Sequence, residues 1–183
     1  ALVGDVEKGH VRLRSQAEPG DLICVTGTLG KSEAGLRLLL AGRKDGYLAG
    51  YLEPKSRLEA EGKAIARHGR AMIDVSDGLG SEVVHICEES GTGARIDWEN
   101  IPLSGITIEA ARIAGGDPRL YALYGGEDFE LVFTIPPENL EPLKKDFSDF
   151  TVVGEILPGE EGIFISRGGE RLELKGGYDH FKG

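Results

Sequence analysis

Residues 129–135, Phe-Glu-Leu-Val-Phe-Thr-Ile, are the feature that most limits how this chain can fold. Its apolar side chains alternate too little with polar ones for a strand that keeps one face in water. We therefore expect a central strand of a sheet. With 183 residues, the chain is long enough to bury a sizeable core around such a sheet, and one domain is the simplest arrangement.

Local patterns elsewhere predict that helices and strands alternate first and that strands fill the last third. The expected strands are residues 22–26, 71–75, 94–97, 151–157, 162–166 and 171–174. The expected helices are residues 32–41, 57–68, 81–89, 106–114 and 137–145, with a loop at 42–55. Ser32 is expected to cap the first helix and Pro142 to weaken or interrupt the last, while Gly168 and Gly169 predict a hairpin turn. These elements predict an α+β fold, a mixed β-sheet covered by helices, that ends in antiparallel hairpins.

Composition and charge exclude several classes of function. The net charge of -10, from 21 basic and 31 acidic residues, argues against a nucleic-acid-binding protein, which would present a basic stripe. No apolar stretch approaches the roughly 18–20 residues of a membrane span, and the first residues lack the basic start of a signal peptide. Cys24 and Cys87 lie in apolar runs, which favours two buried reduced thiols and a cytoplasmic location over a disulfide.

Residues 27–32, Gly-Thr-Leu-Gly-Lys-Ser, follow an expected strand and open an expected helix, as a P-loop does. A P-loop needs four residues between its glycines so that backbone N–H groups can surround a phosphate, and this segment has two. We interpret the segment as a tight glycine turn between a strand and a helix.

Residues 74–79, Asp-Val-Ser-Asp-Gly-Leu, are a stronger candidate site. Asp74 and Ser76 alternate on one side of an extended segment, and a turn then places Asp77. Carboxylate and hydroxyl oxygens suit Mg²⁺, which proteins usually hold with one or two carboxylates and the phosphates of the substrate. The glycine permits a positive φ or a close backbone approach, and the following helix would direct free N–H groups toward an anion. The alternative is an ordinary turn in which Asp77 or Ser81 caps the helix, and the spacing alone favours that alternative.

Two further clusters are candidates for contact with a substrate. Residues 125–131, Gly-Gly-Glu-Asp-Phe-Glu-Leu, bring three carboxylates to the entry of the central strand, where they can accept hydrogen bonds or ligate a metal. The alternative is a glycine-rich turn with solvated charges. Near the chain end, Tyr178 could stack on a flat heterocycle, or Tyr178 and Phe181 could instead pin the C-terminus to the core.

Four segments occur in an order that is typical of a known family: residues 20–30, 73–79, 124–131 and 177–181. Together they resemble the thiamine-monophosphate kinase family of the aminoimidazole-ribonucleotide-synthetase superfamily, and the resemblance spans nearly the whole chain. It implies that ATP donates its γ-phosphoryl group to thiamine monophosphate, giving thiamine diphosphate, with Mg²⁺ as the cofactor.

The same resemblance implies roles for individual residues. Asp74 and Asp77 would ligate Mg²⁺, and Ser76 would contact ATP. Glu127 would bind the substrate, and Tyr178 matches an aromatic residue that lies against the thiamine moiety. Phosphoryl transfer depends mostly on positioning and charge neutralisation, which suits metal ions held by carboxylates.

The family pattern also includes an N-terminal domain that has no counterpart in these 183 residues. That domain bears further metal-binding aspartates, an ATP-contacting arginine and the interface of a homodimer. We expect residues 1–20 to be the connection from it, residues 21–183 to be the C-terminal α+β domain, and the chain alone to have little or no kinase activity. Two alternatives stay open. One is another ATP-dependent enzyme of the superfamily, such as a selenophosphate synthetase or a hydrogenase-maturation dehydratase, and the other is a non-catalytic module that binds a phosphorylated metabolite.

Overall fold

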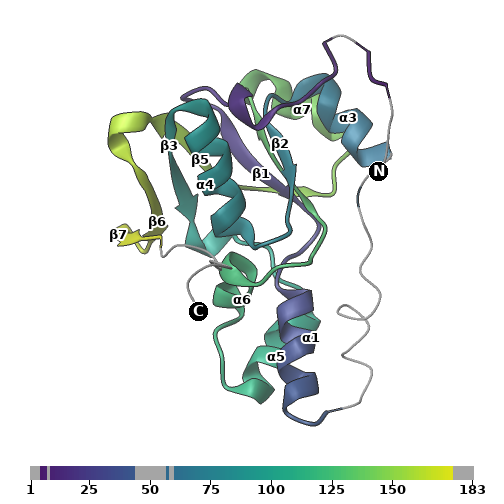
Figure 1. Ribbon diagram of the computed structural model, residues 1–183, viewed down its shortest axis with the longest axis vertical. Coiled ribbons are helices and arrows are strands. Elements are labelled where there is room, and N and C mark those ends of the chain that lie inside the picture. The colour runs from purple at the N-terminus through teal and green to yellow at the C-terminus, as the bar shows by residue number, and fades with distance from the viewer. Residues whose placement is uncertain (1–4, 8, 44–56, 58–59, 175–183) are drawn as a thin grey trace.

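The computed structural model describes residues 5–7, 9–43, 57 and 60–174 (Figure 1). In this part of the chain, seven strands form one mixed sheet in the order β2-β4-β1-β5-β3-β6-β7. The strands are β1 (Leu22–Thr26), β2 (Met72–Asp74), β3 (Thr92–Asp97), β4 (Leu131–Ile135), β5 (Phe150–Pro158), β6 (Ile163–Arg167) and β7 (Glu170–Glu173). The helices are α1 (Lys31–Leu40), α3 (Ala60–His68), α4 (Leu79–Ser90), α5 (Gly105–Ala114), α6 (Pro118–Tyr124) and α7 (Leu140–Asp146). The predicted α+β fold with a mixed sheet is confirmed.

Strand β4 is the buried strand that the apolar run predicts. All five of its residues are buried, and it pairs antiparallel with β1 on one side and with β2 on the other. The expected start at Phe129 is wrong, because Glu127 and Phe129 have φ angles of 64° and 52°. Non-glycine residues with positive φ do not continue a strand, so β4 begins only at Leu131.

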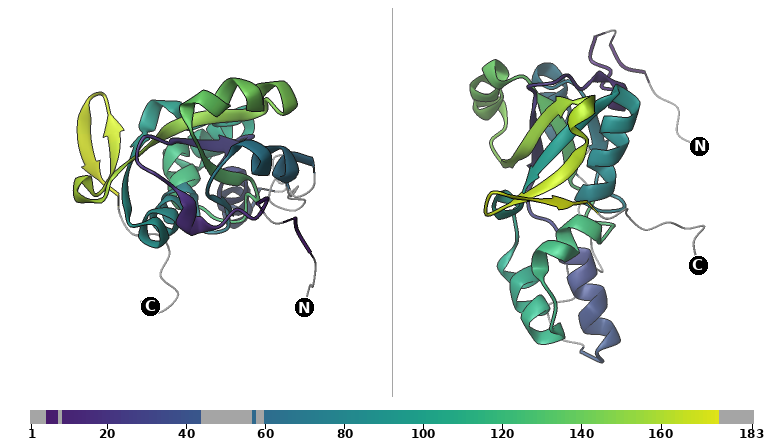
Figure 2. Two further views of the ribbon diagram at one scale, coloured as in Figure 1. Left: turned by 90° about the horizontal axis from the view of Figure 1, so that it is seen from above. Right: turned by 90° about the vertical axis from the view of Figure 1, so that its left-hand side faces the viewer.

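Helices cover both faces of the sheet (Figure 2). Helix α4 packs on one face, where Ile23 of β1 and Ile86 of α4 belong to the same apolar cluster. Helices α3 and α7 pack on the other face, where Cys24 of β1 shares a second cluster with Ile65 of α3 and Leu143 of α7. Successive residues of a strand point to opposite faces, so a strand covered on both sides is apolar at both.

Helices α1, α5 and α6 form a lobe below the sheet in Figure 1, with a third apolar cluster of their own. Helix α6 was not predicted, although its start signal is in the sequence. Asp117 is its N-cap and accepts a hydrogen bond from the Arg119 backbone N–H at 3.0 Å, and Pro118 occupies the first turn. Proline suits that position because the N–H it lacks would have no helical partner.

The last third does not fold as consecutive hairpins, so that expectation is wrong. Strand β5 pairs antiparallel with β1 and β3, and β6 pairs in parallel with β3. Strand β3 and the residue before β6 approach so closely that a Cβ atom at Gly93 would lie 2.6 Å from the Gly162 carbonyl oxygen. Strands β6 and β7 do form the expected hairpin, with Gly168 and Gly169 at its turn in left-handed conformations. The parallel β3–β6 pair is what makes the sheet mixed.

The N-cap of α1 and the extent of α7 also differ from the expectation. Ser32 is not the N-cap of α1, because the helix begins one residue earlier and Gly30 occupies the cap position with a φ of 78°. The segment expected as one helix from residue 137 divides into a 3₁₀ turn, Pro137–Asn139, and α7. Pro142 does not break α7, because it lies in the first turn, where its missing N–H would have no helical partner.

Cys24 and Cys87 are free and buried, as expected. Burial raises the pKa of the Cys24 thiol to about 12 and that of the Cys87 thiol to about 11. No helix among the described residues has both the length and the apolar character needed to cross a membrane. Most of the loop expected at residues 42–55 lies outside the described residues.

Candidate functional site

Residues 74–79 and 125–130, which the sequence separates widely, lie side by side in the structure. The Val75 N–H donates to the Glu130 carbonyl oxygen at 2.8 Å, and the Phe129 N–H donates back to Val75 at 3.1 Å. The Glu127 N–H donates to the Ser76 carbonyl oxygen at 2.9 Å. These bonds continue the antiparallel pairing of β2 and β4 past the ends of both strands. The two candidate clusters therefore form one site.

Two glycines allow this close approach. A Cβ atom at Gly126 would overlap the Ser76 carbonyl oxygen. Gly78 has a φ of 100°, and a Cβ atom there would lie 2.6 Å from the Leu123 carbonyl oxygen. Any other residue at either position would push the two loops apart or strain the backbone.

The helix cap that the spacing of residues 74–79 favoured is absent from this turn. The N-cap of α4 is Gly78, and the Ser81 hydroxyl donates to the Asp77 carbonyl oxygen at 3.3 Å. Neither Asp77 nor Ser81 therefore occupies the cap position. The Asp77 carboxylate is available for a different role.

A cavity of about 530 Å³ opens beside this turn. Its walls include Asp74, which is exposed at the end of β2, and the half-buried Ser76 and Asp77. Glu127 is exposed in the adjoining loop. The structure thus brings together four of the residues that the sequence singled out, whereas Tyr178 lies outside the described residues.

The oxygen atoms at this cavity suit part of a Mg²⁺ site. Asp74 and Asp77 supply carboxylates and Ser76 supplies a hydroxyl, the hard ligands that Mg²⁺ prefers. Nowhere in the described part of the chain do three or more His, Cys, Asp or Glu side chains gather closely enough to hold a metal ion. Because Mg²⁺ commonly takes only one or two protein carboxylates and completes its shell with waters and phosphates, the residues present fit a shared site.

Glu82 also lines the cavity, although the sequence analysis did not single it out. It belongs to the first turn of α4 and accepts hydrogen bonds from Ser76 and from the Asp77 backbone N–H. Burial raises the pKa of the Glu82 carboxyl, and the hydrogen bonds from Asp77 and Ser76 oppose that shift. The N–H groups of Ser76 and Asp77, which come just before the helix whose N–H groups were expected to face an anion, bind a carboxylate of the protein itself.

Asp128, one of the three carboxylates of the second cluster, caps α1. It is 5% exposed, and its two oxygens accept hydrogen bonds from the backbone N–H groups of Gly30 and Ser32. Burial raises the pKa of the Asp128 carboxyl, and those backbone hydrogen bonds act in the opposite direction. The first N–H groups of a helix have no partner within it, so Asp128 replaces the local cap that Ser32 was expected to supply.

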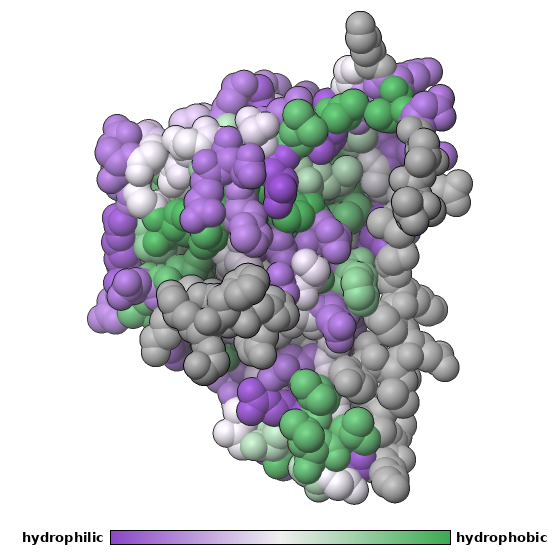
Figure 3. Space-filling model, in the orientation of Figure 1, coloured by the Kyte–Doolittle hydropathy of each residue, from purple (hydrophilic) through white to green (hydrophobic). Residues whose placement is uncertain are grey.

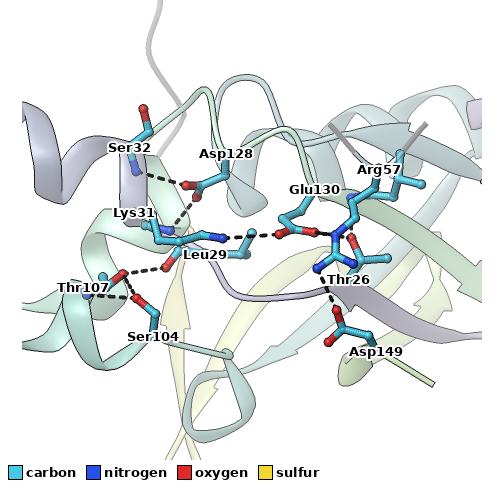
Figure 4. Close-up of polar contacts among 12 residues, drawn as sticks. Thr26, Leu29, Lys31, Ser32, Arg57, Ser104, Thr107, Asp128, Glu130 and Asp149 are labelled. Carbon is cyan, nitrogen blue, oxygen red and sulfur yellow. Dashed lines mark hydrogen bonds and ion pairs between the residues drawn. The ribbon is translucent and has the colours of Figure 1, made fainter. Parts of the chain in front are cut away.

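The Glu130 side chain is likewise held by contacts within the protein (Figure 4). Its side chain accepts hydrogen bonds from the Thr26 hydroxyl at 2.7 Å and from Arg57 Nε at 3.0 Å, and it pairs with Lys31 Nζ at 3.4 Å. Gly27 makes room for it, because a Cβ atom there would overlap the Glu130 carboxylate. The P-loop-like segment is thus a glycine turn around a buried carboxylate, as we interpreted it.

Two arginines that the sequence analysis passed over line the same cavity. Arg12 and Arg14 lie on the segment before β1, which was expected to be only a connection. Arg14 begins a 3₁₀ turn, Arg14–Gln16, that packs on α4, and its guanidinium lies 3.9 Å from the Glu89 carboxylate. Arginine binds phosphate oxygens in a bidentate manner, so the cavity offers groups both for a cation and for an anion. The Arg-Leu-Arg spacing, in which one apolar residue separates two basic residues, was the available signal.

The family model for the C-terminal domain of AIR synthase related proteins matches residues 18–166. The chain belongs to this family. The thiamine-monophosphate kinase of Pyrococcus horikoshii is 42% identical over 98% of this chain and 57% of its own length. The thiamine-monophosphate kinase of Escherichia coli is 38% identical over 97% of this chain and 58% of its own length. The family resemblance drawn from the four segments is confirmed, and the chain spans less than two thirds of the curated relatives it matches.

Solved structures agree with the fold. AaThiL complexed with AMPPCP and TMP matches with a TM-score of 0.79 and 36% identity, over 92% of this chain and 53% of that one. Thiamine-monophosphate kinase from Stenotrophomonas maltophilia matches with a TM-score of 0.79 and 30% identity, over 91% of this chain and 56% of that one. The hydrogenase maturation protein HypE of E. coli matches with a TM-score of 0.71 at 18% identity, which shows the fold alone.

Proposed function

We propose that this chain is the C-terminal portion of a thiamine-monophosphate kinase, which transfers the γ-phosphoryl group of ATP to thiamine monophosphate. The observation that carries the proposal is the cavity where Asp74, Ser76 and Asp77 meet Arg12 and Arg14. Phosphoryl transfer needs cations and donors that neutralise phosphate charge, and this cavity has groups for both. The relatives named thiamine-monophosphate kinase, and the relative solved with AMPPCP and TMP, support the choice of donor and acceptor.

Asp74 and Asp77 would hold Mg²⁺, which when bound offsets the negative charge of the phosphates. Ser76 would contact ATP, and the hydrogen bond that its hydroxyl already makes limits how it can do so. Its hydroxyl proton is directed to Glu82 at 3.2 Å. The Ser76 oxygen is thus left to accept a hydrogen bond, for example from a ribose hydroxyl, or to ligate the metal through a lone pair.

Glu127 and Tyr178 would bind the thiamine monophosphate. Of the three carboxylates in residues 127–130, Glu127 is the one exposed to solvent, so it is the one that a ligand can reach. Leu174, the last described residue, packs over Gly80 in the first turn of α4, with its Cδ1 3.2 Å from where a Gly80 Cβ would lie. Tyr178 lies outside the described residues, and its proposed role rests on the family resemblance.

We further propose that residues 1–20 connect to a preceding domain and that residues 21–183 are the C-terminal domain of a homodimeric enzyme. Val11 and Leu13 are 40% and 53% exposed on that connecting segment, and Leu13 lines the cavity. Figure 3 shows apolar surface along this upper edge of the molecule. Exposed apolar side chains beside a polar cavity are typical of a surface that another domain covers. That domain would supply the remaining metal ligands, so the isolated chain would have little or no kinase activity.

The test compares the full-length enzyme with its Asp74→Asn and Asp77→Asn variants in a thiamine diphosphate formation assay with ATP and Mg²⁺. Each variant should lower kcat/KM by about 100-fold or more, because an amide is a poor Mg²⁺ ligand. Asp146→Asn is the matched control: this exposed aspartate of α7 pairs with His68 on the opposite face of the sheet, and its loss should leave turnover unchanged. Full turnover of the Asp74 and Asp77 variants would refute the metal site, and normal turnover by the isolated chain would refute the need for a preceding domain.

A second candidate is an ATP-dependent enzyme of the same superfamily with a different acceptor, which the fold likeness to HypE allows. Offering the full-length enzyme a panel of acceptors with ATP and Mg²⁺ separates the two. Product formation with thiamine monophosphate alone supports the kinase, and product formation only with another acceptor overturns it.

A further inference from the structure

Glu82 makes an unusual set of contacts for a carboxylate. It is 1% exposed, and all three of its hydrogen bonds end on the same atom, Oε1. The donors are the Ser76 N–H and hydroxyl, both at 3.2 Å, and the Asp77 N–H at 2.9 Å. Burying a carboxylate costs free energy unless donors satisfy it, and here two consecutive residues supply them.

Glu82 holds the segment through its donors, whereas the Ser76 and Asp77 carbonyl oxygens accept hydrogen bonds from the Glu127 N–H and the Ser81 hydroxyl. Val75 on one side is fixed by hydrogen bonds to the neighbouring loop, and Gly78 on the other side is the N-cap of α4. Between them the chain turns from an extended to a helical conformation over Ser76 and Asp77. Glu82 Oε1 reaches back from the first turn of the helix and ties both of these residues to it.

This contact decides which ligand the turn can receive. Successive backbone N–H groups in a turn can bind an anion such as phosphate. The N–H groups of Ser76 and Asp77 are turned toward Glu82, while the side chains of Asp74 and Asp77 line the cavity. The carboxylates of Asp74 and Asp77 favour a cation beside the turn, whereas Arg12 and Arg14, which line the same cavity, favour an anion.

We propose that Glu82 is a positioning residue for the cation site: its Oε1 atom fixes the Ser76 and Asp77 turn so that the carboxylates of Asp74 and Asp77 face one space. The inference rests on the proposed function, since it takes those two aspartates as the ligands of a divalent cation. Glu82 itself acts through the turn and does not ligate the metal.

The experiment uses Glu82→Gln and Glu82→Ala in the full-length enzyme. Glutamine keeps a carbonyl Oε1 that can accept the same three hydrogen bonds, whereas alanine leaves the Ser76 and Asp77 N–H groups without their acceptor. Mn²⁺ binding is measured without nucleotide by electron paramagnetic resonance, and the Mg²⁺ activation constant is measured in the kinase assay. Glu82→Gln should bind Mn²⁺ at least about tenfold more tightly than Glu82→Ala, with the Mg²⁺ constants in the same order.

Thr107→Val is the control for a general loss of stability. The Thr107 hydroxyl is buried in α5 and donates to the Leu29 carbonyl oxygen in the helical lobe, so the variant loses a buried hydrogen bond without touching the turn. It should lower the Tm and leave Mn²⁺ binding unchanged. Equal Mn²⁺ affinities for the two Glu82 variants, or equal weakening by Thr107→Val, would overturn the proposal.

The two proposals fail in different ways. If the enzyme does not phosphorylate thiamine monophosphate but Mn²⁺ binding follows the expected order, the function is wrong and the positioning role of Glu82 stands. If thiamine diphosphate forms and Glu82→Ala binds Mn²⁺ as tightly as the unsubstituted enzyme, the function stands and the positioning role is wrong.

Discussion

Replacing Gly126 with alanine tests whether the two loops of the site behave as one unit. The new Cβ would overlap the Ser76 carbonyl oxygen, whereas real Cβ atoms essentially never come within 3.0 Å of a heavy atom to which they are not bonded. Gly126 is not among the residues with positive φ, so the effect comes from the contact and not from backbone strain. The two loops would have to separate by about 1 Å.

The expected loss of free energy of unfolding follows from the contacts that this separation of the loops disturbs. It breaks or lengthens the 2.9 Å hydrogen bond from the Glu127 N–H to the Ser76 carbonyl oxygen, which contributes about 0.5–1.5 kcal/mol. Forcing an extra methyl group into a closely packed region costs about 1–3 kcal/mol more. Gly126→Ala should therefore lower the free energy of unfolding by about 2–4 kcal/mol.

Urea unfolding, followed by circular dichroism and by the fluorescence of Trp98, measures this loss. Gly105→Ala is the matched control, because a Cβ at this first residue of α5 has no atom within 4 Å. That variant should be neutral or stabilising by up to about 1 kcal/mol, since alanine favours a helix more than glycine does. The reasoning is refuted if Gly126→Ala unfolds at the same urea concentration as the unsubstituted chain, or if both variants shift equally.

Two further groups of residues give predictions about stability. Asp128→Ala removes both acceptors at the start of α1 and leaves the buried N–H groups of Gly30 and Ser32 without a partner. Chemical denaturation should show that the free energy of unfolding falls by about 2–4 kcal/mol. Asp128→Asn keeps one acceptor and should lose less, and equal losses for the two variants would contradict the capping role. Burial raises the thiol pKa to about 12 for Cys24 and about 11 for Cys87. Iodoacetamide at pH 8 should therefore label both cysteines in denaturant and neither in the folded chain. Equal labelling rates in the folded and the denatured chain would show that the thiols are accessible. These pKa values exceed the unfolded value of 9.0, so the unfolded state releases the protons first and stability falls as the pH rises from 9.0 toward about 11 and 12. The free energy of unfolding should fall by up to about 1.4 kcal/mol per pH unit for each thiol. The double variant Cys24→Ala, Cys87→Ala should lack this fall. An unchanged fall in that variant would show that other groups cause the loss of stability at alkaline pH.

Local patterns in the sequence predicted the elements whose conformation nearby residues decide. The apolar run at 129–135 gave an interior strand because its side chains suit both covered faces of the sheet. The expected strand at 22–26 coincides with β1, and the apolar spacing at 81–89 marked most of α4. Helix α6 had the local signal of Asp117 followed by Pro118, so its omission was an error of interpretation and not a limit of the sequence.

The pairing of the last strands did depend on distant parts of the chain. Nothing between residues 151 and 174 shows that β6 lies beside β3, because that neighbour comes from much earlier in the sequence. The turn at Gly168 and Gly169 has its own conformational signal, so the β6–β7 hairpin was predictable whereas the parallel pair was not.

For the site, the sequence by itself determined which residue types are available: two aspartates, a serine and one glycine at 74–79, and three carboxylates and two glycines at 125–131. The tertiary structure decided which of them are free. Asp128 is used by the start of α1 and Glu130 by Thr26, Lys31 and Arg57, whereas Glu127 stays exposed. The physical reason is that a carboxylate is neutralised by whichever donors surround it, and those donors lie about 70–105 residues away along the chain.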